Sequence, residues 1–271
     1  LSEVVWSPKE NKNWNSFNER LQPHFTAFEQ KGWNYSKGNF KTAIKPESQN
    51  GQLFVSLSTE AYKGNVVYTT DNSTPTTQSK FYTEPIAINA STTLKAAVLV
   101  DGKIMSAIPA QQNFVMHKAI GKDVNYANPV SRYYMADGPN SLTDGVRGAN
   151  AVTKYWHGFS AKDMIATIDL GETKNIQNIT LGCLQNYSDW IFLPQSVRFE
   201  TSNDGISFTE IKTLKNAIDL NERNVLFDFK ATFATQPARF IRVTAKNNLC
   251  PPGHNGEGKP GWIFADEIVV E

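Results

Sequence analysis

Short apolar runs that alternate with polar residues, separated by turn-forming residues, recur through most of this chain and constrain its fold most strongly. In Leu53–Leu57 and Ala166–Leu170 every second residue is apolar, which is the period of a strand with one buried face. Turn sequences such as Asp101-Gly102 and Ser202–Gly205 end such runs and are typical of β-hairpins. Strands and helices do not alternate as a parallel sheet requires. We therefore predict a mainly all-β protein made of β-sandwiches.

One segment near the start has helical spacing instead. Its apolar face is formed by residues three and four apart, namely Phe17, Leu21, His24, Phe25 and Phe28. Asn13 is placed to cap the first turn and Gly32 to end the last one, because these residue types favour those positions. We expect a helix over about residues 14–31.

Composition limits the classes of function. The chain has 271 residues, enough for about two domains, and 27 Lys+Arg nearly balance 26 Asp+Glu. This balance gives no reason to expect a nucleic acid or an anionic membrane as partner, and no apolar run reaches the roughly 20 residues of a membrane helix. Its two cysteines are too few for a disulfide framework or a four-thiolate zinc site. Because the start, Leu1–Trp6, has no Met and no signal peptide, we expect a fragment of a longer protein.

The first residues contain a set of aromatic and polar motifs: Ser2–Pro8, Trp14, Phe17, Arg20-Leu21 and Gly32–Tyr35. These motifs resemble the end of the catalytic barrel of a family 20 glycoside hydrolase. Ser2 stands where the family usually has Ala. The resemblance implies that residues 1–38 are the helical tail of a barrel that lies upstream of this chain.

Residues 39–117 contain the motif Tyr68–Pro75, followed by Ser79, Tyr82 and Pro85-Ile86. With this motif they resemble the small β-sandwich that is appended to chitobiases and β-hexosaminidases. Asn72 replaces the usual Gly of its turn, and we expect the turn to persist because Asn tolerates the left-handed conformation. The resemblance implies an immunoglobulin-like sandwich.

Residues 118–271 contain six characteristic sequence blocks: Leu142–Gly145, Trp156, Ile168–Gly171, Ser202–Gly205, Arg239–Val243 and Asp266–Ile268. In their order and spacing they resemble a discoidin-type (coagulation-factor C-type) domain, the fold of family 32 carbohydrate-binding modules. The resemblance implies a discoidin-like jelly roll of the galactose-binding type. The expected fold is thus two β-sandwich domains preceded by a short helical segment.

No catalytic residue is assigned to this chain. A glycosidase needs two carboxyl groups, and in family 20 enzymes these form an adjacent Asp-Glu pair. The adjacent pair here, Asp266-Glu267, lies in the last β-run, and we interpret it as structural. The catalytic residues of the parent enzyme, a β-N-acetylhexosaminidase by resemblance, are expected upstream.

The discoidin-like resemblance also implies a metal site, with calcium as the expected ion. In that family an Asp of the early Asp-Gly loop and a Glu of the last strand approach each other, and here these are Asp144 and Glu267. Their oxygen atoms suit calcium. However, Val146–Ala149 replaces the Asp/Asn and Thr that usually follow. The alternative is that Asp144 caps a turn and Glu267 pairs with an arginine.

Two candidate loops carry aromatic residues beside polar ones, as sugar binding requires. They are Asn186–Trp190 and Pro251–Gly258, which leads to Trp262. The candidate sugar-binding residues are Tyr187, Trp190, His254 and Trp262. Trp156 and Phe264 are expected in the core, and the expected partner is a glycan or terminal sugar, galactose or an N-acetylhexosamine.

Cys183 and Cys250 each lie where a strand leads into a candidate loop. We predict that they lie close enough for a disulfide, with two free buried thiols as the alternative. A disulfide would fit an exported protein, and export to the periplasm, the cell surface or the medium is expected here.

These expectations combine into the accessory region of an exported β-N-acetylhexosaminidase, with the last domain as a carbohydrate-binding module. The alternative is that both sandwiches pack on the barrel and bind no ligand. A free-standing adhesin fits the barrel-like start less well. The alternatives differ in whether Tyr187 and Trp190 are exposed on a concave loop surface or buried.

Overall fold

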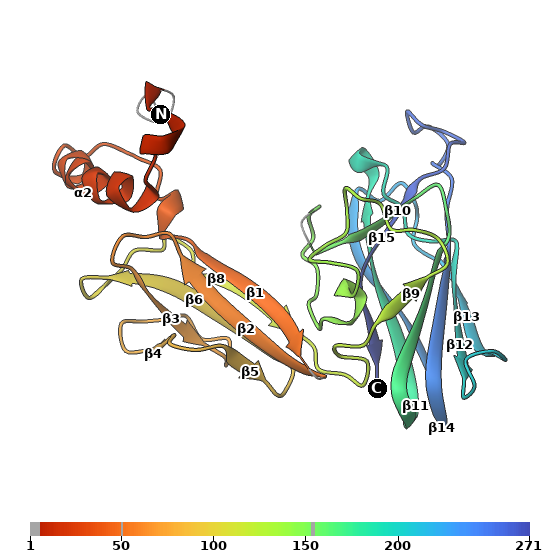
Figure 1. The fold of residues 1–271 in the computed structure, drawn as a ribbon. Coiled ribbons are helices and arrows are strands. Elements are labelled where there is room, and N and C mark those ends of the chain that lie inside the picture. The colour runs from red at the N-terminus through yellow and green to blue at the C-terminus, as the bar shows by residue number, and fades with distance from the viewer. Residues whose placement is uncertain (1–5, 50, 153–154) are drawn as a thin grey trace. The chain divides into compact units, whose positions relative to one another are not determined.

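The computed structural model describes residues 6–49, 51–152 and 155–271, and Figure 1 shows the fold. Within these residues the α-helix is α2 (Trp14–Gln30), and short 3₁₀ helices lie at η1 (Lys9–Asn11), η2 (Gly38–Phe40), η3 (Ser141–Thr143) and η4 (Tyr187–Asp189). The strands are β1 (Thr42–Gln49), β2 (Gln52–Thr59), β3 (Asn65–Thr69), β4 (Lys80–Phe81), β5 (Ile86–Ile88), β6 (Thr92–Val100), β7 (Lys103–Ile104), β8 (Ala110–Phe114), β9 (Val124–Tyr126), β10 (His157–Ser160), β11 (Met164–Asn186), β12 (Ser196–Ser202), β13 (Thr209–Lys215), β14 (Asn224–Lys246) and β15 (Trp262–Val270). The mainly all-β class is confirmed.

The chain forms two compact units. One comprises residues 1–45, 56–85 and 93–112, and the other comprises residues 46–55, 86–92 and 113–271. Each unit is described by itself below. The boundary that the sequence places between residues 117 and 118 stays a prediction.

Helix α2 begins and ends where its capping residues predict. The Asn13 side chain accepts a hydrogen bond from Ser16 N at 2.9 Å, and Gly32 adopts a φ of +65° just after the helix. The helix contacts segments that flank the strands of its own unit. Asn18 Nδ2 donates to Glu60 O at 2.6 Å, and the Phe25 ring packs against the ring of the buried Phe40.

The strands after α2 form two sheets. One sheet has the order β1-β2-β5, and the other has the order β4-β3-β6-β7 with β8 paired to β6. The predicted hairpin between β6 and β7 is confirmed, because Asp101 and Gly102 adopt φ values of 46° and 74°. Asn72 adopts a φ of 67°, so the turn persists without its usual glycine.

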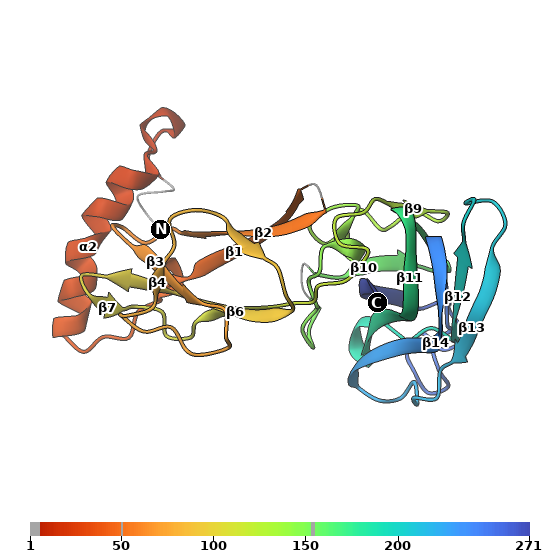
Figure 2. The same cartoon turned by 90° about the horizontal axis from the view of Figure 1, so that it is seen from below.

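The second unit contains a seven-stranded antiparallel sheet in the order β10-β15-β11-β14-β12-β13, with β9 paired to β11. Its two longest strands, β11 and β14, lie side by side in Figures 1 and 2 and pair from Met164↔Ala245 to Asn186↔Asn224. The sequence predicts two separate strands within β11. The structure instead joins them into one strand whose register shifts between Asp169 and Asn178.

The register shifts mark a bend that brings both ends of β11 to the same place. A straight strand of 23 residues would extend roughly 75 Å. Yet Ala161 N, just before β11, donates to Gly261 O at 3.2 Å, and Trp190 O, just after it, accepts from Trp262 N at 2.9 Å. Strand β11 therefore turns a corner at its bulges, as strands that join two packed sheets do.

The core of this unit lies between its strands. Its large fully buried side chains include Phe159, Met164, Ile168, Phe199 and Phe229. Trp156 and Phe264 are also buried, as predicted. In the described part of the chain, no helix is long and apolar enough to cross a membrane.

Truncation of the core phenylalanine Phe199 to alanine is expected to lower the free energy of unfolding by about 3–5 kcal/mol, because its ring is fully buried. The matched control is Ile206→Ala, since Ile206 is 85% exposed and should change stability by less than about 0.5 kcal/mol. Urea unfolding of both variants checks this, and similar losses in both would contradict the core described here.

Candidate functional site

The two loops predicted to carry the site lie next to each other. One contains η4 and joins β11 to β12, and the other joins β14 to β15. Their backbones are hydrogen-bonded, with Trp262 N donating to Trp190 O at 2.9 Å and Phe192 N donating to Trp262 O at 3.0 Å. The bend in β11 places them together, although more than fifty residues separate them in sequence.

A buried histidine holds the two loops together. The His254 ring, 6% exposed, meets the rings of Tyr187, Trp190 and Phe192 edge to face, with centroids 4.5, 5.3 and 5.4 Å away. Edge-to-face contacts of this kind are favourable beyond the area they bury. We call these four residues the loop aromatic cluster.

Both ring nitrogens of His254 are already hydrogen-bonded inside the protein. Gly256 N donates to His254 Nδ1 at 3.0 Å, so Nδ1 carries no proton. His254 Nε2 therefore carries the proton and donates to Tyr187 O at 3.0 Å. His254 thus positions the loops, and its ring offers no free hydrogen-bonding group to a ligand.

Trp190, in the loop aromatic cluster, has an unusual backbone conformation. It adopts a left-handed conformation with a φ of 63°, which is rare for a bulky residue and points to a functional constraint. Its ring lies so close to Gly256 that a Cβ added there would overlap it. Trp190 and Tyr187 are both partly exposed, so neither is simply a core residue.

Polar residues surround the partly exposed rings. Ser188, Asp189, Asn255 and Glu257 are all exposed on the same two loops. Glu257 is oriented by a hydrogen bond that its Oε2 accepts from Gly253 N at 2.9 Å. The arrangement offers an aromatic face beside carboxylate, amide and hydroxyl groups.

The Trp262 ring does not join this cluster. An isolated bridge pairs Trp262 with Ile191, and both side chains pack in a separate cluster with Trp156 and Phe264. The Trp262 ring meets Tyr134 edge on, with centroids 5.3 Å apart. Its backbone joins the two loops, while its ring supports the adjacent apolar cluster.

The predicted disulfide is wrong, because both thiols are free and buried. Cys183 belongs to the core cluster between the strands, whereas Cys250 lies in the β14–β15 loop outside that cluster. Backbone hydrogen bonds hold this loop instead: Cys250 N donates to Lys259 O at 2.8 Å and Gly261 N donates to Asn248 O at 2.9 Å.

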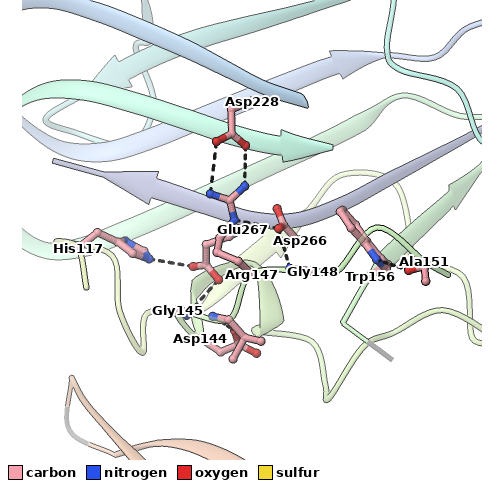
Figure 3. A network of polar contacts seen from close by, with 11 residues as sticks. His117, Asp144, Gly145, Arg147, Gly148, Ala151, Trp156, Asp228, Asp266 and Glu267 are labelled. Carbon is pink, nitrogen blue, oxygen red and sulfur yellow. Dashed lines mark hydrogen bonds and ion pairs between the residues drawn. The ribbon is translucent and has the colours of Figure 1, made fainter. Parts of the chain in front are cut away.

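The predicted metal ligands Asp144 and Glu267 do come together, as Figure 3 shows. Asp144 follows η3 and Glu267 lies in β15. Burial raises the pKa of both carboxyl groups well above the usual range, and the charge of Glu267 raises that of Asp144 further.

Three N–H donors bind the carboxyl oxygens of this acid pair. Glu267 Oε2 accepts from Gly145 N at 3.0 Å, and Asp144 Oδ1 accepts from Val146 N at 2.8 Å. Glu267 Oε1 lies 2.8 Å from His117 Nε2. Ala119 N donates to His117 Nδ1 at 3.2 Å, so Nε2 carries the proton. Burial lowers the pKa of His117 to about 4, so the ring is a neutral donor at pH 7.

The calcium site stays a prediction. Calcium takes about six to eight oxygen ligands, and three of the four carboxyl oxygens of Asp144 and Glu267 accept N–H groups of the protein. Among the residues that the structure describes, no group of three or more His, Cys, Asp or Glu side chains is arranged to hold a metal ion.

The neighbouring carboxylate, Asp266, is held by an arginine. Asp266 Oδ2 accepts from Arg147 Nε and from Gly148 N, both at 2.8 Å, and Arg147 also pairs with Asp228. The alternative to a metal site was that Glu267 pairs with an arginine. In the structure Arg147 pairs with Asp266 instead. Both members of the Asp266-Glu267 pair are buried and engaged, which fits their structural interpretation.

Sequence reasoning missed four residues of these networks: Phe192, Gly256, His117 and Arg147. Of these, Gly256 could have been found from the sequence, because a glycine in a loop often marks a place where another group packs closely against the backbone. His117 has no such signal, since its partner Glu267 is 150 residues away.

Comparisons with known proteins agree with two of the three resemblances. Residues 45–109 match the chitobiase/beta-hexosaminidase C-terminal domain family, and residues 126–260 match the F5/8 type C domain family. No curated protein matches the chain. The resemblance of residues 1–38 to the end of a barrel stays a prediction.

Several solved structures are similar to part of the chain. A chitosan-binding module 1 from a chitosanase/glucanase of Paenibacillus sp. IK-5 is 16% identical, with a TM-score of 0.38, over 58% of this chain and 98% of that one. CBM32-3 from a family 31 glycoside hydrolase of Clostridium perfringens is 18% identical, with a TM-score of 0.40, over 58% and 94%. The lectin domain of lectinolysin, complexed with Lewis B antigen, is 14% identical, with a TM-score of 0.38, over 58% and 96%.

Replacing Gly256 with alanine is expected to displace the Trp190 ring and to cost about 1–3 kcal/mol of stability, because the added Cβ overlaps that ring. The indole N–H resonance of Trp190 should shift in an NMR spectrum. Asn255→Ala, one residue away and exposed, is the control and should leave that resonance in place. An unmoved Trp190 signal in Gly256→Ala would contradict the packing described here.

Proposed function

Because the chain carries a chitobiase/beta-hexosaminidase C-terminal domain and an F5/8 type C domain, we propose that it is the carbohydrate-binding accessory region of an exported glycoside hydrolase. The parent enzyme is proposed to be a β-N-acetylhexosaminidase, which removes terminal N-acetylhexosamine from glycans. The F5/8 type C domain binds a terminal sugar, galactose or an N-acetylhexosamine.

The observation that carries this proposal is the meeting of two loops around His254. It leaves Trp190 and Tyr187 partly exposed beside Asp189 and Asn255, which are exposed. The apolar face of a sugar ring stacks on an aromatic ring, while its hydroxyl groups bind carboxylate and amide groups. Exposed aromatic residues on a connection are otherwise uncommon.

The proposed binding is weak and depends on tethering. One terminal sugar buries little surface against the cost of association, so a dissociation constant around 1 mM is expected. Because the module is covalently attached to its enzyme, weak binding still gives the enzyme a high effective concentration of substrate. The module thus holds its enzyme near glycan without taking part in the chemistry.

The helical region is proposed to pack against the catalytic barrel of the same protein. Trp6, Trp14 and Trp33 are 84%, 53% and 57% exposed. Large apolar side chains gathered in one short region indicate an interaction surface. This favours a structural role for residues 1–38, alongside sugar binding by the last domain.

Titration of the chain with galactose, N-acetylglucosamine and N-acetylgalactosamine, followed by NMR, tests the sugar site. We expect at least one sugar to shift the Trp190 indole signal and Trp190→Ala to weaken its binding by tenfold or more, since about 1.4 kcal/mol of lost stacking is a factor of ten. Trp33→Ala is the matched control, because Trp33 is exposed in the other unit. If no sugar shifts Trp190 at high millimolar concentration, the sandwiches bind none of these sugars and the structural alternative stands.

The chain by itself is expected to show no hexosaminidase activity, because its adjacent Asp266-Glu267 pair is buried and bonded to other residues. A chromogenic N-acetylglucosaminide assay of the purified chain checks this. Turnover that is abolished by Glu267→Gln would overturn the structural interpretation of the pair.

A further inference from the structure

We infer that, in the F5/8 type C domain, the carboxyl groups of Asp144 and Glu267 bind N–H donors of the protein itself and bind no calcium ion. Figure 3 shows the residues concerned. The inference concerns the stability of the domain and does not rest on sugar binding.

The directions of the hydrogen bonds carry the argument. A metal ion needs the lone pairs of several oxygens aimed at one point. Here three of the four carboxyl oxygens each accept an N–H group of the protein: Glu267 Oε1 from His117 Nε2, Glu267 Oε2 from Gly145 N and Asp144 Oδ1 from Val146 N. These donors leave fewer lone pairs for a metal ion than calcium requires.

A permanent positive charge also lies beside the pair. Arg147 follows the Asp144 loop and binds Asp266, the residue before Glu267, with Nε to Oδ2 at 2.8 Å. A guanidinium stays charged at any ordinary pH. By pairing with both Asp266 and Asp228, it fastens the loop after Asp144 to two strands without a metal ion.

The hydrogen bonds perform the cross-linking that a metal would provide. Glu267 in the last strand is joined to His117, which precedes the first strand of the domain, and to Gly145 in the early loop. These contacts span 150 and 122 residues of sequence. His117 therefore links the start of the domain to its last strand.

The first test compares the melting temperature of the full chain in calcium chloride and in EDTA. We expect the two values to agree, and calorimetric titration with calcium to give only the heat of dilution. A calcium site at hundred-fold excess over its dissociation constant would raise the melting temperature by roughly 5–10 °C. A rise of that size overturns the inference.

The second test removes the donor with His117→Leu. We expect its melting temperature to fall by the same amount in calcium and in EDTA, because a buried carboxyl oxygen loses its partner. His24→Leu, at an exposed helical position, is the control and should melt like the wild type. Restoration of the His117→Leu melting temperature by calcium would show that Glu267 is a metal ligand and that the inference is wrong. Should His117→Leu fail to fold, the wild-type comparison decides alone.

Discussion

The bend in β11 is the constraint on which the rest of the second unit depends. The strand pairs with β14 along nearly its whole length and changes direction at its bulges between Asp169 and Asn178. Its two ends therefore meet at one end of the sandwich, where the β14–β15 loop also returns. Without that corner the residues near Trp190 and those near Trp262 would lie far apart, and no shared loop surface would exist.

The bend in β11 also explains why a histidine, and not a disulfide, joins the candidate loops. The backbone already brings them within hydrogen-bonding distance, so one side chain can bridge them. His254 Nε2 donates to Tyr187 O on the other loop, while His254 Nδ1 accepts from Gly256 N on its own loop. This fixes the rings around it while Trp190 stays partly exposed, which is the preorganisation that a weak binding site needs.

Much of the fold follows from local sequence, because strand alternation, helix caps and turns depend on near neighbours. The helix caps Asn13 and Gly32 and the turn residue Asn72 behave as their side chains predict. Contacts between distant residues do not follow in this way. The Trp262 ring points into another cluster because of its bridge to Ile191, and His117 reaches Glu267 only in the folded domain. The sequence indicates that Tyr187, Trp190 and His254 lie on loops, but the contact between them and the inward role of His254 depend on residues 67 positions apart.

The central claim is that Trp190 forms the contact face for a sugar, and intermolecular NOEs measure this most directly. When a sugar that binds the chain is present at a saturating concentration, we expect NOEs from the ring protons of the sugar to the indole protons of Trp190. NOEs to Trp262 and Tyr134 in place of Trp190, or to residues at the bend of β11, would contradict it.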